Sequence, residues 1–160
     1  MNALSLAKLF SLALSLSFTA LVFSSTASAC DCAGPSGKKA IRKDSVAFRG
    51  TVTNIEYLDV KNSSIDPRIV VTFSVARVWS GDVSQTFVLL TTENSWTCAG
   101  YYFVKDKEYL VVAYPNDEET EKRFGDVKNT FGTNLCGATL PIDSAKQALA
   151  DLGNGKKPKH

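Results

Sequence analysis

Two cysteines one residue apart, Cys30 and Cys32, directly follow a segment typical of a signal peptide, and this feature constrains the fold most. The first 29 residues contain one charged side chain, Lys8, then an apolar run over 9–23 and small residues up to Ala29. A positive start, a short apolar stretch and a small-x-small site are typical of secretory signal peptides. We therefore expect residues 1–29 to be removed, which makes Cys30 the mature N-terminus.

A removed leader predicts a secreted or periplasmic protein. The sequence Ser-Ala-Cys before residue 31 also fits a bacterial lipoprotein cleavage site, in which Cys30 would carry lipid and anchor the protein to a membrane. Ala27 argues against this alternative, because it stands where a large aliphatic residue would be expected. Without lipid on Cys30 we expect no membrane association.

Four cysteines remain after cleavage: Cys30, Cys32, Cys98 and Cys136. An even number in an exported chain predicts disulfides. A bond between Cys30 and Cys32 would close a very small strained ring, so two long-range bridges are favoured, each contributing about 4 kcal/mol in the chain-entropy model. A tetracysteine zinc site would need a second close pair of cysteines. A redox pair would need the C-x-x-C helix start that lowers a thiol pKa.

The sequence of the mature chain predicts mostly β-strands. Alternating or apolar β-branched runs occupy 44–60, 68–82, 84–92 and 107–114, and a weaker run with two glycines at 128–140 predicts a bulged strand. Five strands with turn-rich connections predict a mainly β, OB-fold-like closed barrel. We expect one domain over 30–153.

Two helices are expected beside the barrel. A short one is predicted within 38–48, near the mature N-terminus. A clearer one spans 141–153, with Asp143 or Ser144 as N-cap and Gly153 at the C-cap. Its apolar stripe consists of Ile142, Ala145, Ala148, Leu149 and Leu152. Residues 154–160 predict a flexible basic tail.

Charge and histidine content exclude several function classes. The full chain has a net charge of +2, which falls to +1 without Lys8, so no nucleic-acid footprint is present. His160 is the only histidine, and it lies in the tail. The commonest general base and metal ligand is therefore missing from the predicted barrel. We expect a protein that is not an enzyme, has no cofactor of its own and is a monomer.

The order of these features resembles the N-terminal netrin-like domain of the tissue inhibitors of metalloproteinases. The resemblance rests on the exposed C-x-C, on AIRKDSVAFRGTV at 40–52, on FSVARVWSGD at 73–82, on TCAGYYF at 97–103 and on the late cysteine before a terminal helix. It extends over nearly all of 30–153, as in a single-domain bacterial-type member.

The resemblance implies metalloprotease inhibition. In that family the free α-amine and carbonyl of the first cysteine chelate the catalytic zinc of the target protease and displace its water. The inhibitory ridge would here be Cys30, Asp31, Cys32, Ala33 and Gly34. The implied disulfides are Cys30–Cys98 and Cys32–Cys136. A secondary contact would come from Asn94, Ser95, Trp96 and Thr97.

This chain differs from the family at three points. Arg42 aligns with the first cysteine of a third disulfide, and the animal C-terminal domain has no counterpart. Asp31 stands where the family has Thr or Ser pointing into the protease specificity pocket. Burying a carboxylate in an apolar pocket costs on the order of several kcal/mol of binding free energy unless a cation pairs with it. Two other hypotheses therefore remain, a non-inhibitory OB-fold interaction or structural module stapled at its N-terminus, and an enzyme or redox protein.

Overall fold

The structure, a computed structural model, describes residues 37–58, 68–92, 98–118 and 130–160. Strands make up most of the regular structure in these residues. The elements in chain order are η1 (Gly37–Ala40), β1 (Val46–Leu58), β2 (Arg68–Ser80), β3 (Thr86–Thr92), β4 (Glu108–Pro115), β5 (Phe131–Gly132), β6 (Leu140–Pro141), η2 (Ile142–Ser144) and α3 (Lys146–Leu152).

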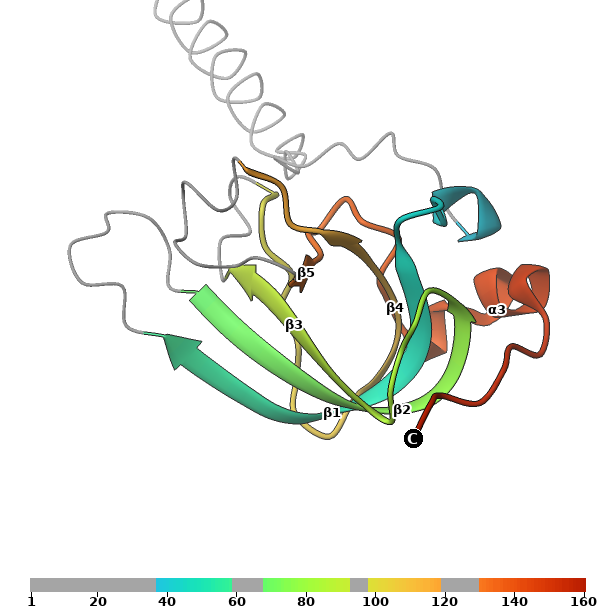
Figure 1. Cartoon of the computed structure of the whole chain (residues 1–160), viewed down its shortest axis with the longest axis horizontal. Coiled ribbons are helices and arrows are strands. Elements are labelled where there is room, and N and C mark those ends of the chain that lie inside the picture. The colour runs from blue at the N-terminus through green and yellow to red at the C-terminus, as the bar shows by residue number, and fades with distance from the viewer. Residues whose placement is uncertain (1–36, 59–67, 93–97, 119–129) are drawn as a thin grey trace, which may run out of the picture.

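The strands close into a barrel because β1 has partners on both edges. It pairs antiparallel with β2 along its length and with β4 over its first half. β3 pairs antiparallel with β2 and in parallel with β5 through Leu90 and Gly132, and β5 in turn pairs with β4. The order β1-β2-β3-β5-β4 therefore returns to β1 (Figure 1). This is the predicted five-stranded, OB-fold-like closed barrel.

Aromatic rings fill the barrel interior. Phe48 of β1 lies edge-on to Phe73 of β2, with ring centroids 5.4 Å apart, and Phe73 lies edge-on to Phe103 at 5.2 Å. Phe103 then meets Tyr109 of β4 at 5.0 Å. Such pairs contribute about 0.5–1.5 kcal/mol each beyond their burial. The loop that follows Cys98 therefore supplies part of the core, which fixes its course.

The predicted bulged strand at 128–140 is instead two short strands, β5 and β6. Residues 133–139 between them leave the sheet and fold back as a loop. Two buried threonines in this loop, Thr133 and Thr139, both lie within hydrogen-bond distance of the Val112 carbonyl oxygen. Side-chain hydroxyls thus take the place of a backbone ladder here, which a strand pattern does not reveal.

The N-terminal helix is shorter than predicted. Only Gly37–Ala40 is helical, as a 3-10 turn. Val46, Ala47 and Phe48 are fully buried and belong to β1, so barrel packing overrides a helix in the second half of the predicted segment. The first residues of the strand are needed in the core.

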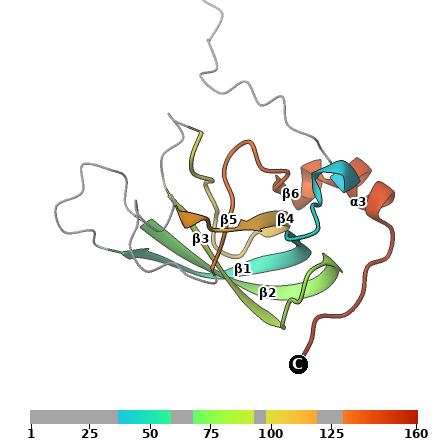
Figure 2. The same cartoon turned by 45° about the horizontal axis from the view of Figure 1, so that its top comes forward.

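The C-terminal helix forms, but its predicted N-cap is wrong. A 3-10 turn takes residues 142–144, and α3 starts after Ala145, which offers no side-chain capping bond. The C-cap prediction agrees with the structure, since Gly153 has φ 72° and its N–H bonds to the Leu149 carbonyl. Ala145, Ala148, Leu149 and Leu152 cover the outer face of β4 at Leu110. Both views place η1 beside α3 (Figures 1 and 2).

The tail after α3, predicted to be flexible, is instead hydrogen-bonded to the barrel. Val78 and Lys156 exchange both backbone hydrogen bonds, at 2.9 and 2.8 Å. Further on, the Gln85 N–H donates to the Lys159 carbonyl at 3.0 Å. Figure 1 shows this segment running from α3 past β2. Its backbone acts as a short added strand, a pairing that its basic composition does not indicate.

The turn at Gly81 gives the first test of the fold. Gly81 has φ 78°, and a Cβ there would lie 2.6 Å from Val46 Cγ1 at the start of β1. We expect Gly81→Ala to lower the free energy of unfolding by about 2–3 kcal/mol, through left-handed strain and overpacking together. Gly37→Ala is the matched control, because Gly37 has φ 59° and the nearest atom to a built Cβ, Asp151 Oδ2, lies at an ordinary contact distance of 3.6 Å. It should cost only about 1 kcal/mol. Urea unfolding of both variants measures the difference, and equal losses would contradict the packing argument.

Candidate functional site

The predicted ridge at 30–34 and the predicted secondary contact at 94–97 lie outside the described residues. The structure does describe the two cysteines to which the ridge is predicted to be joined. Cys98 and Cys136 are both disulfide-bonded. Their predicted partners, Cys30 and Cys32, lie outside the described residues, so the pairing itself stays a prediction.

The barrel brings the segments that carry Cys98 and Cys136 together. The Leu135 N–H donates to the Cys98 carbonyl oxygen at 3.3 Å, so the residue directly before Cys136 is hydrogen-bonded to Cys98. Cys98 has φ 57°, an uncommon conformation for a residue with a side chain. We call residues 98–101 and 133–137 the cystine platform. It joins the loop after β3 to the loop after β5.

A network of buried threonine hydroxyls positions the cystine platform. Thr91 at the end of β3 donates to the Thr133 carbonyl at 3.1 Å and accepts from the Tyr101 N–H at 3.0 Å. It therefore links both halves of the platform. Thr133 and Thr139 lie 3.0 Å apart between their hydroxyls, and Thr139 also accepts from the Val112 N–H at 3.1 Å. Since these three hydroxyls and the backbone groups that they bond to are buried, removing a hydroxyl would leave polar groups unsatisfied.

Gly100 allows the platform to approach β3 closely. A Cβ at this position would overlap the Thr92 carbonyl oxygen and lie 2.7 Å from Thr92 Oγ1. No other residue fits without moving the strand. The glycine two residues after Cys98 therefore has a packing reason, and it lets Tyr101 and Phe103 enter the core.

Tyr101 is 9% exposed and lies in the platform between Phe103 and Tyr109. Burial, with a smaller contribution from Tyr109, raises the pKa of Tyr101 to about 12. The phenol is therefore neutral throughout the physiological range. It serves the platform as an apolar wedge and not as an acid or base.

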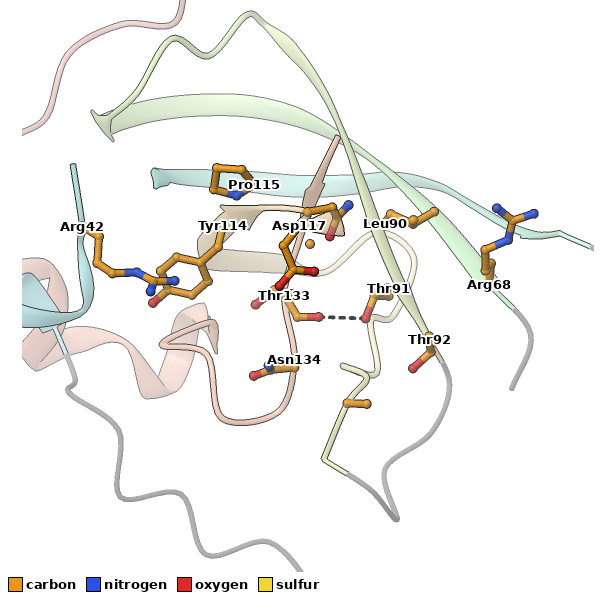
Figure 3. A pocket seen from close by; sticks show the side chains of 13 residues that line it. Arg42, Arg68, Leu90, Thr91, Thr92, Tyr114, Pro115, Asp117, Thr133 and Asn134 are labelled. Atoms are coloured by element: carbon orange, nitrogen blue, oxygen red, sulfur yellow. Dashed lines mark hydrogen bonds between the residues drawn. The ribbon is translucent and has the colours of Figure 1, made fainter. Parts of the chain in front are cut away.

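A cleft of about 340 Å³ opens beside the platform and shares Ala99, Thr133 and Asn134 with it. Arg42 and Arg68 lie at opposite ends of this cleft (Figure 3). The Arg42 guanidinium stacks 4.0 Å from the centroid of the Tyr114 ring, and the Tyr114 hydroxyl donates to the Ala40 carbonyl at 3.0 Å. These two contacts tie the segment entering β1 to β4. An exposed cation–π contact contributes about 0.5–1 kcal/mol.

Sequence reasoning identified the cysteines but missed the residues that position them. Thr91, Thr133 and Thr139 look like ordinary strand threonines, and no local motif separates a buried hydroxyl from an exposed one. Arg42 was noted only for the cysteine it replaces. Its stacking on Tyr114 depends on two segments that are far apart in the sequence.

The described residues show neither a metal-ligand cluster nor a helix that is long and apolar enough to cross a membrane. No protein-family model matches this chain, and no curated protein is significantly similar to it.

The threonine network gives the second prediction. Thr133→Val keeps the side-chain shape but removes a buried hydroxyl, and we expect the free energy of unfolding to fall by about 1–3 kcal/mol. The amide of Leu135 should also exchange its hydrogen faster, because the loop carrying Cys136 loses a tether. Thr53→Val is the control, since the Thr53 hydroxyl bonds to the Thr72 carbonyl at an exposed position. Its effect should stay within about 0.5 kcal/mol. If Thr133→Val leaves Leu135 exchange unchanged, the network does not position the platform.

Proposed function

We propose that the protein is an exported metalloprotease inhibitor. In this proposal the free α-amine and the carbonyl oxygen of Cys30 chelate the catalytic zinc of a target protease. The zinc belongs to the target, and the mature inhibitor brings no metal of its own. The amine and carbonyl displace the water that the protease uses as nucleophile.

The observation that carries this proposal is the cystine platform. A C-x-C pair can be held at both cysteines only if the two partner cysteines lie close together. Cys98 and Cys136 are both disulfide-bonded, and the Cys98 carbonyl accepts a hydrogen bond from the neighbour of Cys136. The platform thus supplies two adjacent anchors for the predicted bonds Cys30–Cys98 and Cys32–Cys136.

Rigid anchoring suits the chelating role. A five-membered chelate binds well only when amine and carbonyl are held in one geometry, since ordering a free chain end on binding costs free energy. The threonine network and the close approach at Gly100 fix the anchors on the barrel. The ridge at 30–34 would inherit that rigidity through two disulfides.

The platform also offers an apolar contact beside the proposed ridge. Leu135 precedes Cys136 and is 42% exposed, which is high for a large aliphatic side chain. Such a side chain at the rim of a zinc site would be covered by the protease in the complex. We propose that it adds to the contact surface expected from Asn94–Thr97.

Arg42 supports the proposal at the position where the resemblance predicts a third disulfide. Its stacking on Tyr114 connects the same N-terminal segment to β4 without a covalent bond. The link is weaker than the roughly 2–4 kcal/mol of a disulfide. It still holds the chain where it emerges from the ridge.

A non-inhibitory interaction module is the second candidate, and Asp31 favours it. A carboxylate directed into an apolar protease pocket loses hydration without compensation. The inhibitor proposal therefore requires a target with a polar or basic pocket. Lipid on Cys30 would occupy its amine or its thiol and so exclude the inhibitor role, and N-terminal sequencing of the exported protein tests that directly.

The chelation mechanism predicts the effect of one added residue. An alanine placed before Cys30 converts the amine into an amide, a poor zinc ligand, and adds bulk at the metal. Inhibition across a panel of zinc proteases should fall by orders of magnitude, while urea unfolding stays unchanged. Equal inhibition by processed and extended protein would rule out chelation.

Asp31→Thr separates the two candidate functions. In the inhibitor proposal the side chain contacts only the protease, so stability should change by less than about 0.5 kcal/mol. Inhibition of an apolar-pocket protease should improve, because no carboxylate is desolvated. Inhibition of a basic-pocket protease should weaken, because its cation loses a partner. Titrating both proteins against both kinds of protease measures this. If neither wild type nor Asp31→Thr inhibits either kind of protease, the interaction module is the function that remains.

A further inference from the structure

We infer that the face formed by β2 and the C-terminal tail binds a phosphate group through Arg77, either free phosphate or the headgroup of an anionic lipid. This site lies apart from the cystine platform and does not depend on the proposed inhibition. We call it the Arg77 face. It comprises Arg49, Arg77, Trp79, Lys157 and His160.

Two arginines stand directly opposite each other on neighbouring strands of this face. Arg49 of β1 is the cross-strand partner of Arg77 of β2. Like charges in this arrangement destabilise a sheet. Glu108 neutralises Arg49 with a bidentate pair, Nε to Oε1 at 2.7 Å and Nη2 to Oε2 at 2.8 Å. This pairing raises the pKa of Arg49, mainly through the hydrogen bond that Arg49 donates to the Glu108 carboxylate.

Arg77 has no such partner. Among the residues that the structure describes, no hydrogen bond or ion pair reaches its exposed guanidinium. The chain thus keeps an unpaired arginine directly opposite one whose charge Glu108 already balances. A guanidinium held in this way is suited to bind an external anion through two parallel hydrogen bonds.

The docked tail brings further donors to Arg77. One hollow, of about 500 Å³, is lined by Arg77 together with Lys157 and His160. The backbone on either side of Lys157 is fixed, because Lys156 bonds to Val78 and Lys159 to Val83 and Gln85. The ammonium of Lys159 is already paired with Asp82 at 2.7 Å, which leaves Lys157 as the tail lysine in the hollow.

His160 adds a ring donor to the same hollow. The Gln85 side-chain amide lies 2.8 Å from His160 Nδ1. When the amide donates to Nδ1, the neutral ring carries its proton on Nε2 and offers that N–H as a donor. A guanidinium, an ammonium and an imidazole N–H from separate segments match a tetrahedral anion with several acceptor oxygens better than a carboxylate with two.

A second hollow, of about 490 Å³, is lined by Arg77 together with Arg49 and Trp79. The Trp79 indole is fixed by its hydrogen bond to the Gly153 carbonyl at 2.9 Å. Among the described residues that line the two hollows, none has an acidic side chain. The whole chain is only slightly basic at +2, so this concentration of positive charge is local. A local positive field in concave surface attracts anions.

The test uses the mature chain and two probes. Inorganic phosphate is titrated while the side-chain NMR signals of Arg77 and Trp79 are followed. Vesicles of phosphatidylcholine, with and without phosphatidylglycerol, are then used for co-sedimentation. We expect saturable shifts of both signals with phosphate. If the protein also sediments with vesicles that contain phosphatidylglycerol, the ligand is a lipid headgroup. If it sediments with neither kind of vesicle, the ligand is free phosphate.

Variants decide whether the site is specific. Arg77→Gln should weaken phosphate binding roughly tenfold, the loss typical of one charge-assisted contact. Lys105→Gln removes the same charge from an exposed turn that lines neither hollow, and it should change the affinity by less than about twofold. The thermal midpoint of Arg77→Gln should stay close to that of wild type, because the exposed guanidinium has no partner within the described residues to lose. If Arg77→Gln does not fold, Lys157→Gln provides the same comparison. The proposal is overturned if phosphate affinity falls equally in the Lys105 variant and in the Arg77 or Lys157 variant. It is also overturned if phosphate causes no saturable shift of the NMR signals.

Discussion

The pairing of β1 with both β2 and β4 is the interaction on which the rest of the structure depends. It closes the sheet, so that the barrel strands enclose one interior and the rings of Phe48, Phe73 and Phe103 can pack against each other. Closure also removes the open edges that an antiparallel sheet would otherwise present. β4 is consequently buried on both faces, one in the barrel and one under α3. The loops after β3 and β5 must then leave the barrel at neighbouring places, which is where the cystine platform forms.

Buried hydroxyls complete what closure begins. Thr91, Thr133 and Thr139 satisfy backbone groups that have no sheet partner, and they connect two loops that carry a cysteine each. A polar network of this kind is stabilising only when all of its members are satisfied. For the proposed inhibitor, the benefit is a rigid base under the chelating N-terminus. For a non-inhibitory module, the same base would simply keep the N-terminus attached to the barrel.

Much of the fold was predictable because it rests on local periodicity. The four longer strands and the apolar stripe of the C-terminal helix follow from alternation and from 3.6-residue spacing. Gly153 marks a helix end that the structure confirms. Predictions failed where a contact distant in sequence replaced a local one. The helix N-cap shifted to Ala145, and the expected bulged strand became a loop held by Thr133 and Thr139.

By itself, the sequence determined that this chain is mainly β, that five strands close into a barrel, and that its cysteines are suited to disulfides, since these properties depend on composition and spacing. Only the tertiary structure decided which side chains meet. It placed Leu135 beside Cys98, Arg42 over Tyr114, and Arg77 opposite Arg49. It also paired the basic tail with β2, where the sequence indicated a free end. Contacts of this kind depend on strand register and on loop closure, which join residues far apart in the chain and leave no periodic trace in it.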